Sequence, residues 1–130
     1  MAERIAYRGM TPTQAATITN EQYLELINSR ERRSVKRNGM LYKKLCDKVK
    51  KYQENKITKA VRTHIREAVI LPAWIGMKFE VHDGKEFKPL VITANMLGHR
   101  LGEYAYTTKR VQHSAPGIRA TRGSKFLAVK

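Results

Sequence analysis

Hydrophobic residues in the first part of the chain recur at the spacing of an α-helix. Tyr23 and Ile27 lie one helical turn apart and therefore share a face. Just before them, Thr19 and Gln22 fit a capping box, because the threonine side chain can accept a backbone N–H while the glutamine side chain reaches back to the cap. We therefore predict a helix over residues 20–33.

A second helix is predicted after a break in the chain. Asn38-Gly39 is a turn signal, and Thr11-Pro12 marks another turn or helix start nearer the N-terminus. Apolar residues then recur at i, i+4 and i+8, namely Leu41, Leu45 and Val49. This spacing predicts a helix that ends near Asn55, with lysines on much of its remaining surface. Both helices are too polar to be stable alone, so each needs another surface against which to pack.

The middle of the chain changes from helical to strand periodicity. Three apolar residues alternate with polar ones, namely Met77, Phe79 and Val81. Asp83-Gly84 predicts a two-residue hairpin turn, and residues 85–93 supply the returning strand, which Pro89 places at an edge or a bulge. An apolar run over residues 68–72 predicts the remaining strand. We expect an α+β fold, with a small three-stranded antiparallel sheet, N-terminal helices and a basic, extended C-terminal tail.

The charge of the chain is concentrated in two segments. The 130 residues include 26 Lys and Arg against 11 Asp and Glu, a formal net charge of +15. Residues 28–66 hold 14 basic and 3 acidic residues, a net charge of +11, and residues 105–130 hold six basic residues and no acidic one. A folded centre flanked by basic segments is typical of proteins that bind nucleic-acid phosphates. A solubilising surface is the plainer alternative, and a membrane surface fits less well because the second helix has a narrow apolar face.

The length suits one domain with three parts. We predict a helical N-terminal extension and basic helix over residues 1–56, a compact sheet core over 57–108 and an extended basic tail over 109–130. No apolar run approaches the roughly 20 residues of a membrane-spanning helix, and the N-terminus lacks the apolar stretch of a secretory signal. The one cysteine, Cys46, excludes a disulfide framework within the chain and is interpreted as a small core residue.

Catalytic and metal-binding constellations do not emerge from the sequence. The histidines are scattered without the close spacing of a zinc site, namely His64, His82, His99 and His113. No glycine-rich phosphate loop is present. We therefore predict no metal, no cofactor and no enzymatic activity. Two other classes stay open: a DNA-binding regulator, although the two predicted helices lie further apart than in a helix-turn-helix, and an RNA nuclease that uses His82 or His99.

The segment Leu97-Gly98-His99-Arg100-Leu101-Gly102-Glu103-Tyr104, hereafter the 97–104 loop, has an unusual composition. Its two glycines flank His-Arg-Leu and indicate a backbone that passes close to another group. In one interpretation the glycines simply form a loop that ends the sheet. In the other, the backbone lies near a phosphate, with His99 and Arg100 as donors. Composition alone does not decide between the two.

Together with Asp83-Gly84-Lys85, Ile92 and Thr107, this loop closely resembles the signature of the universal small-subunit ribosomal protein nineteen family. The resemblance covers essentially the whole chain. Residues 113–121 and the N-terminal Tyr7-Arg8-Gly9 are similar to the archaeal and eukaryotic branch. The archaeal form fits better, because the eukaryotic proteins carry a longer basic N-terminus.

The resemblance implies a structural protein of the cytoplasmic ribosome, with a small α+β core and no catalysis. Members sit in the head of the small subunit, bind its large ribosomal RNA (rRNA) and neighbour the head protein of the thirteen family. They lie near an intersubunit bridge, which implies contact with large-subunit rRNA. In the archaeal and eukaryotic branch the tail reaches towards the decoding region and the aminoacyl-site tRNA.

We expect an RNA-binding surface made of mobile lysine contacts and more directional, bidentate arginine contacts. The specific contacts are assigned to the hairpin turn and the 97–104 loop, and the tail is expected to fold on contact with RNA. The predicted RNA-binding residues are Lys43, Lys44, Lys48, Lys50, Lys51, Arg62, Arg66, Lys85, Gly98, His99, Arg100, Gly102, Lys109, Arg110, Arg119, Arg122 and Lys125.

Overall fold

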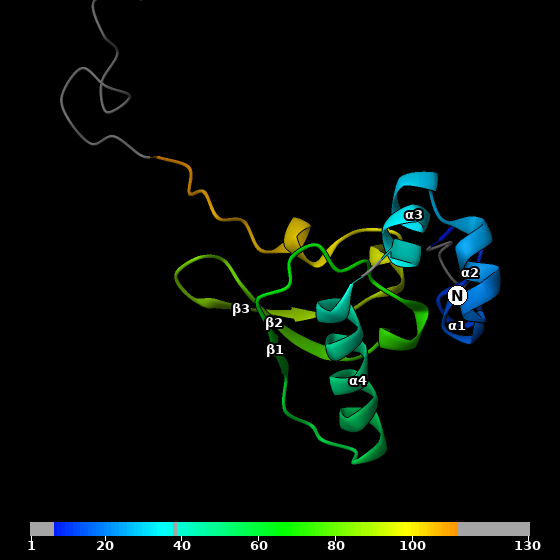
Figure 1. Cartoon of the computed structure of the whole chain (residues 1–130), viewed down its shortest axis with the longest axis horizontal. Coiled ribbons are helices and arrows are strands. Elements are labelled where there is room, and N and C mark those ends of the chain that lie inside the picture. The colour runs from blue at the N-terminus through cyan, green and yellow to red at the C-terminus, as the bar shows by residue number, and fades with distance from the viewer. Residues whose placement is uncertain (1–6, 38, 112–130) are drawn as a thin grey trace, which may run out of the picture.

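The computed structural model describes residues 7–37 and 39–111 and shows an α+β fold (Figure 1). The helices are α1 (Pro12–Thr17), α2 (Asn20–Leu26), α3 (Ser29–Arg37) and α4 (Met40–Glu54). The strands are β1 (Val61–Thr63), β2 (Lys78–His82) and β3 (Phe87–Val91). Three short 3-10 helices are η1 (Pro72–Trp74), η2 (Ala94–Met96) and η3 (Leu101–Tyr104). Helices α1 to α3 gather at one end of the molecule, and the β2–β3 hairpin points away from them (Figure 1).

The helix predicted over residues 20–33 is in fact two helices. The Thr19 capping box that starts α2 is confirmed. Ile27, however, ends α2 in an extended conformation and is buried in the core. The Arg32 guanidinium of α3 donates hydrogen bonds of 3.0 Å to the carbonyls of Glu25 and Ile27, which satisfies acceptors left open where α2 ends. The break is therefore stabilised by hydrogen bonds between residues five and seven apart and by the burial of Ile27 in the core.

The other two helices follow their local signals. Thr11 caps α1 with a second capping box, so the Thr11-Pro12 signal marks a helix start. Helix α4 spans the predicted region and buries Leu45 and Val49. Leu41, predicted on the same apolar stripe, is instead 66% exposed, because the face of α4 that packs against the core carries Tyr42, Leu45 and Val49. The part of the chain that the structure describes contains no helix long and apolar enough to cross a membrane.

The sheet is mixed rather than antiparallel, with strand order β1-β2-β3. Strand β1 runs parallel to β2, with Val61 opposite Phe79, and β2 runs antiparallel to β3. The predicted sheet was wrong because β1 is a three-residue strand within the basic segment, where Val61 and Thr63 are buried and Arg62 is exposed. Pro89 lies on the edge strand β3, as its missing N–H predicts.

The apolar run assigned to the third strand is buried but does not join the sheet. Ala68, Val69 and Ile70 belong to the core. Val69 forms an isolated bridge with Arg100. This run therefore packs against the 97–104 loop, a partner distant in sequence that local periodicity does not reveal.

The hairpin is present, but its turn is shifted by one residue. The Asp83 N–H donates to the Glu86 carbonyl at 2.9 Å, which places Gly84 and Lys85 at the centre of the turn. Gly84 has φ of +103°, a conformation that favours glycine. The Asp83 carboxylate accepts from the backbone N–H groups of Lys85 and Glu86 at 2.9 and 2.7 Å. These hydrogen bonds lower the pKa of Asp83 from its ordinary 3.8 to about 2.

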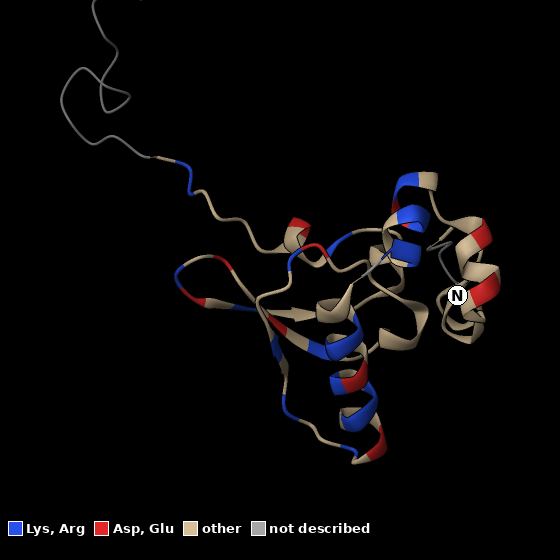
Figure 2. Ribbon diagram, viewed as in Figure 1, with Lys and Arg blue, Asp and Glu red and all other residues tan. Residues whose placement is uncertain are grey.

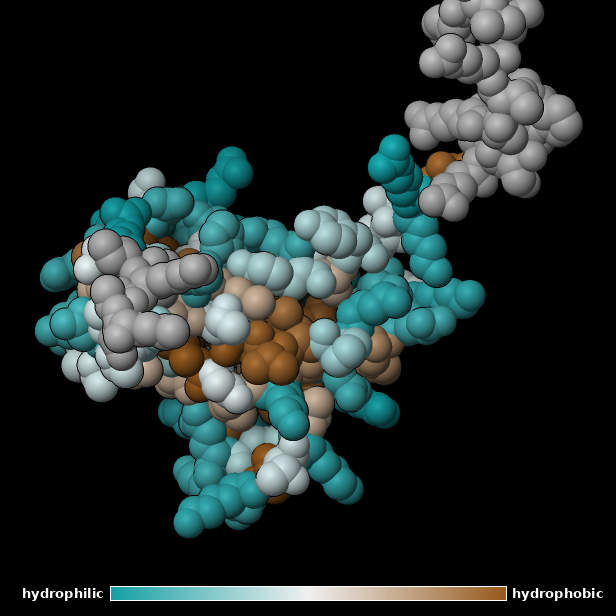
Figure 3. All heavy atoms as spheres, turned by 180° about the vertical axis from the view of Figure 1, so that it is seen from behind, coloured by the Kyte–Doolittle hydropathy of each residue, from teal (hydrophilic) through white to brown (hydrophobic). Residues whose placement is uncertain are grey.

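The fold leaves some apolar side chains on the surface. Seen from behind, apolar atoms form an area over the middle of the folded part, with hydrophilic residues around it (Figure 3). The large hydrophobic residues that are exposed in the described part are Met40, Leu41, Ile57, Val91, Tyr106 and Val111.

Candidate nucleic-acid interface

The 97–104 loop is anchored to helix α2 by a buried tyrosine. The Tyr23 hydroxyl donates to the Ile70 carbonyl at 2.6 Å and accepts from the Gly98 N–H at 2.9 Å. The Tyr23 side chain is fully buried, and burial raises its pKa well above the ordinary value. One hydroxyl therefore joins three segments that are far apart in the sequence.

The two glycines of the loop are explained by contacts within the chain. Gly98 has φ of +80°, where other residues are strained. At Gly102, an added Cβ would lie 3.0 Å from both the Cβ and the carbonyl oxygen of Arg66. Gly102 is therefore required by close packing, and Gly98 by the backbone turn.

The backbone N–H groups of the loop are also committed internally. Those of Gly98, Leu101 and Gly102 donate to Tyr23, Ala68 and Arg66, respectively. Those of His99, Arg100 and Glu103 donate within the segment 96–103. These groups cannot at the same time donate to a phosphate, so the side chains, and not the amides, are the donors that the loop can offer to RNA.

The two basic side chains of the loop remain accessible, beside the exposed carboxylate of Glu103. His99 is 52% exposed, and its Nδ1 lies 2.7 Å from Oε2 of Glu103. Arg100 is 30% exposed, and its Nε lies 3.4 Å from Oε1 of Glu31 on α3. The Glu31 carboxylate orients the guanidinium without using its whole fork of five N–H donors. The structure thus brings Arg100 beside the basic helix α3.

Arg66 is a structural residue in this fold. Its guanidinium donates to the His82 carbonyl at 2.6 Å, to the Gly102 carbonyl at 3.1 Å and to the Ala105 carbonyl. The side chain thereby joins the end of β2 to η3 and to the residue that follows it. A guanidinium with three carbonyl partners has few N–H donors left for a phosphate. We therefore do not propose the bidentate RNA contact that the sequence predicted for Arg66.

Arg62 and Lys48 show how the basic helix meets the sheet. The Lys48 ammonium donates to the Arg62 carbonyl at 2.8 Å, which docks α4 on β1. The Arg62 side chain is exposed, with Nε 2.5 Å from Oε2 of Glu80 and its guanidinium 5.3 Å from the Phe87 ring centroid. Arg62 is held on the sheet surface and can still reach a phosphate.

Helices α3 and α4 carry eight of the sixteen exposed Lys and Arg residues of the described part, and Figure 2 shows basic positions along both helices. The predicted lysines on α4 that are exposed are Lys43, Lys44, Lys50 and Lys51. Helix α3 adds exposed cations that the sequence interpretation did not single out, namely Arg30, Arg33, Lys36 and Arg37. The net charge of residues 28–66 indicated that this segment is basic. Its exposed face could not be assigned from the sequence, because the prediction did not include the break at Ile27 that separates α3 from α2.

The remaining predicted cations lie apart from α3 and α4. Lys85 is exposed at the hairpin turn, and Lys109 and Arg110 are exposed beyond η3. Three predicted tail residues, Arg119, Arg122 and Lys125, lie outside the described residues. The candidate interface in the described part therefore consists of α3, α4 and the adjacent 97–104 loop.

The alternative sites for metal or nucleophilic chemistry gain no support. His64 and His82 are adjacent, with ring centroids 4.5 Å apart, although they are distant in sequence. Within residues 7–37 and 39–111, no group of three or more His, Cys, Asp or Glu residues could hold a metal ion. Burial raises the pKa of the Cys46 thiol, which disfavours the reactive thiolate and agrees with the interpretation of Cys46 as a packing residue.

Comparisons with known proteins agree with this picture. The family model described as Ribosomal protein S19 matches residues 33–113, more than half of the chain. A curated relative, "Small ribosomal subunit protein uS19" of Saccharolobus solfataricus, is 45% identical over 126 residues, which cover 95% of this chain and 90% of that protein. The resemblance seen in the 97–104 loop is confirmed, and the chain belongs to the ribosomal protein S19 family.

Proposed function

We propose that this protein is a structural, non-enzymatic constituent of the small ribosomal subunit that binds its rRNA during translation in the cytoplasm. Family membership supports the ribosomal role. The single structural observation that carries RNA binding is the basic surface of α3 and α4, next to which Glu31 holds Arg100.

The surface suits recognition of RNA by shape. RNA helices present phosphates and 2′-hydroxyls, while their deep major groove is hard to read. The exposed lysines of α4 serve as mobile phosphate contacts, and Arg62 and Arg100 supply more directional donors. His99 adds a donor beside Arg100. Gly98, Gly102 and Arg66 act indirectly, because they set the path of the loop that carries these side chains.

The position that we propose for the protein within the ribosome rests on the family resemblance. We propose that the protein lies in the head of the small subunit, beside the head protein of the thirteen family and near a bridge to large-subunit rRNA. The basic residues of the tail, Lys109 to Lys125, extend towards the decoding region and the aminoacyl-site tRNA. Site-specific photocrosslinking from position 119 tests this placement, and crosslinks confined to RNA remote from the decoding region would contradict it.

Salt dependence tests the rRNA-binding function directly. The full chain should co-sediment with the small subunit and leave it only in high salt. Its affinity for isolated small-subunit rRNA should fall steeply with salt, because about six to ten phosphate contacts release counterions. An affinity that does not change with salt would refute the proposal.

The ranking of contacts has its own test. Arg100→Ala should weaken incorporation into reconstituted subunits more than Lys43→Ala, because a forked donor oriented by Glu31 is harder to replace than a mobile lysine. Urea unfolding of both variants separates loss of binding from loss of stability. Equal incorporation of the two folded variants would count against the assigned role of Arg100.

A further inference from the structure

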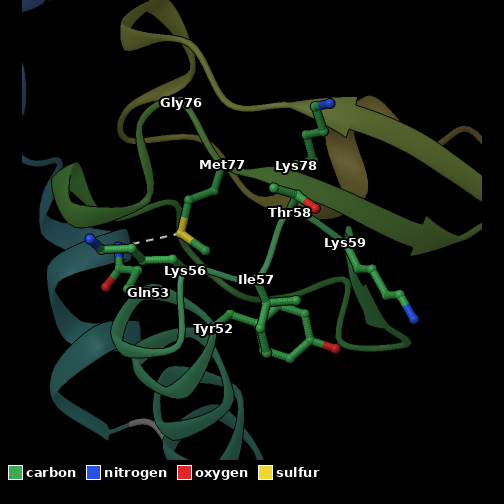
Figure 4. Close-up of a pocket in the computed structure, with 9 residues that line it drawn as sticks. All are labelled: Tyr52, Gln53, Lys56, Ile57, Thr58, Lys59, Gly76, Met77 and Lys78. Atoms are coloured by element: carbon green, nitrogen blue, oxygen red, sulfur yellow. Dashed lines mark hydrogen bonds between the residues drawn. The ribbon is translucent and has the colours of Figure 1, made fainter.

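Two adjoining hollows lie between the end of α4 and the edge of the sheet, away from the 97–104 loop. The first has a volume of about 300 Å³ and lies between residues 52–59 and 76–78 (Figure 4). The second has a volume of about 490 Å³ and lies between α4, β1 and β2. Tyr52 and Lys59 line both hollows, so the two are neighbours, and we call them together the α4–sheet groove.

The groove combines an apolar floor with a basic rim. Tyr52 and Met77 are partly buried and pack against the core, and Ile57 is 39% exposed between them and solvent. The cations that line the groove are Lys48, Lys56, Lys59, Lys78 and Arg62. Its one acidic lining residue, Glu80, is paired with Arg62 at 2.5 Å. The groove thus offers apolar surface beside a strong excess of positive charge.

Contacts on its wall hold the groove open before any ligand binds. The Gln53 amide donates to the Ala73 carbonyl at 2.6 Å and lies 3.3 Å from the Met77 sulfur, which fixes the end of α4 to the segment before β2 (Figure 4). The Ile57 N–H donates to the Tyr52 carbonyl at 3.0 Å and turns the chain back beneath the helix. A preformed site loses less conformational entropy when it binds a ligand.

We propose that the α4–sheet groove binds an unpaired nucleotide of RNA, with its base on the apolar floor and its flanking phosphates on the lysines of the rim. Unpaired bases are recognised by aromatic and apolar surfaces, and backbones by adjacent cations. The first hollow reaches the lower end of the range of ligand pockets, about 300–1,000 Å³. A peptide made of acidic residues alone would use the cations and leave the apolar floor uncovered. This inference rests on the proposed rRNA-binding function and adds a second site to it.

Removal of rim charges tests the phosphate contacts. Lys59→Gln and Lys78→Gln should each reduce the slope of log affinity against log salt by about 0.7, the value for one single-strand phosphate contact. The double variant should reduce it by about 1.4. The matched control is Lys88→Gln, because the Lys88 side chain is 41% exposed on β3, does not line the groove and is not among the proposed RNA contacts. The probe is intact small-subunit rRNA, and the full chain is used throughout.

Comparison with Arg100→Ala separates failure of this site from failure of the proposed function. If the wild-type chain binds rRNA and Arg100→Ala weakens binding, but Lys59→Gln and Lys78→Gln leave the salt slope unchanged, as Lys88→Gln does, the groove proposal is refuted while the function stands. If the wild-type chain shows no salt-dependent rRNA binding, both proposals fall.

Photocrosslinking tests the position of the base. A benzophenone amino acid in place of Ile57 in assembled small subunits should crosslink to rRNA at an unpaired nucleotide, read as a stop in reverse transcription. A crosslink to a neighbouring protein, or to a base within a regular helix, would overturn the proposal.

Discussion

Tyr23→Phe is the sharpest test of how the 97–104 loop is held. The change removes one hydroxyl and leaves the Ile70 carbonyl and the Gly98 N–H without their partner. Ile70 is fully buried, and an unsatisfied buried polar group costs about 1–3 kcal/mol. Gly98 is only half-buried, so water can partly replace its partner and its cost is lower. We expect the free energy of unfolding to fall by about 2–3 kcal/mol, since both losses act together.

Urea unfolding followed by far-UV circular dichroism measures this change. The slope of the free energy of unfolding against urea concentration should be the same in the variant and the wild type. Amide hydrogen exchange should become faster at Gly98, and rRNA affinity should fall because the loop carries His99 and Arg100. Tyr106→Phe is the matched control, because that side chain is 77% exposed. If Tyr23→Phe shifts the free energy of unfolding by less than about 0.5 kcal/mol, the size of an ordinary surface substitution, the anchoring role is refuted.

Three further predictions concern packing, pH and thiol reactivity. Gly102→Ala should destabilise the fold by about 1–3 kcal/mol in urea unfolding, because its Cβ meets the Arg66 backbone, and an unchanged midpoint would disprove that contact. The Asp83 pKa is lowered to about 2, so its contribution to stability is complete above 3.8 and is lost as the pH falls towards 2. The stability difference between wild type and Asp83→Ala should therefore shrink over that interval, and a constant difference would contradict the assignment. Cys46 should react with a thiol reagent more slowly than free cysteine at pH 8, because its partial burial raises the thiol pKa, and an equal rate would contradict that raised pKa.

The candidate site was only partly predictable from the sequence. The positive charge of residues 28–66 identified the basic surface, and the 97–104 loop identified the family. The roles of single arginines could not be read in the same way. Arg66 and Arg100 are alike as residue types, yet three backbone carbonyls occupy the first, and one carboxylate orients the second. The partners of each guanidinium lie in distant segments, so composition cannot tell them apart.

The sequence by itself determined the structural features that depend only on residues a few positions apart. The Thr19 capping box, the β2–β3 hairpin and the edge position of Pro89 all follow from such local rules. The tertiary structure decided the break at Ile27, the parallel pairing of β1 and the burial of residues 68–70 against the 97–104 loop. The strand pairing and the burial of residues 68–70 depend on hydrogen bonds between segments far apart in the chain, and the break at Ile27 depends on the burial of that side chain in the core. Such long-range pairing leaves little periodic signal in short segments, which is why only the folded chain reveals it.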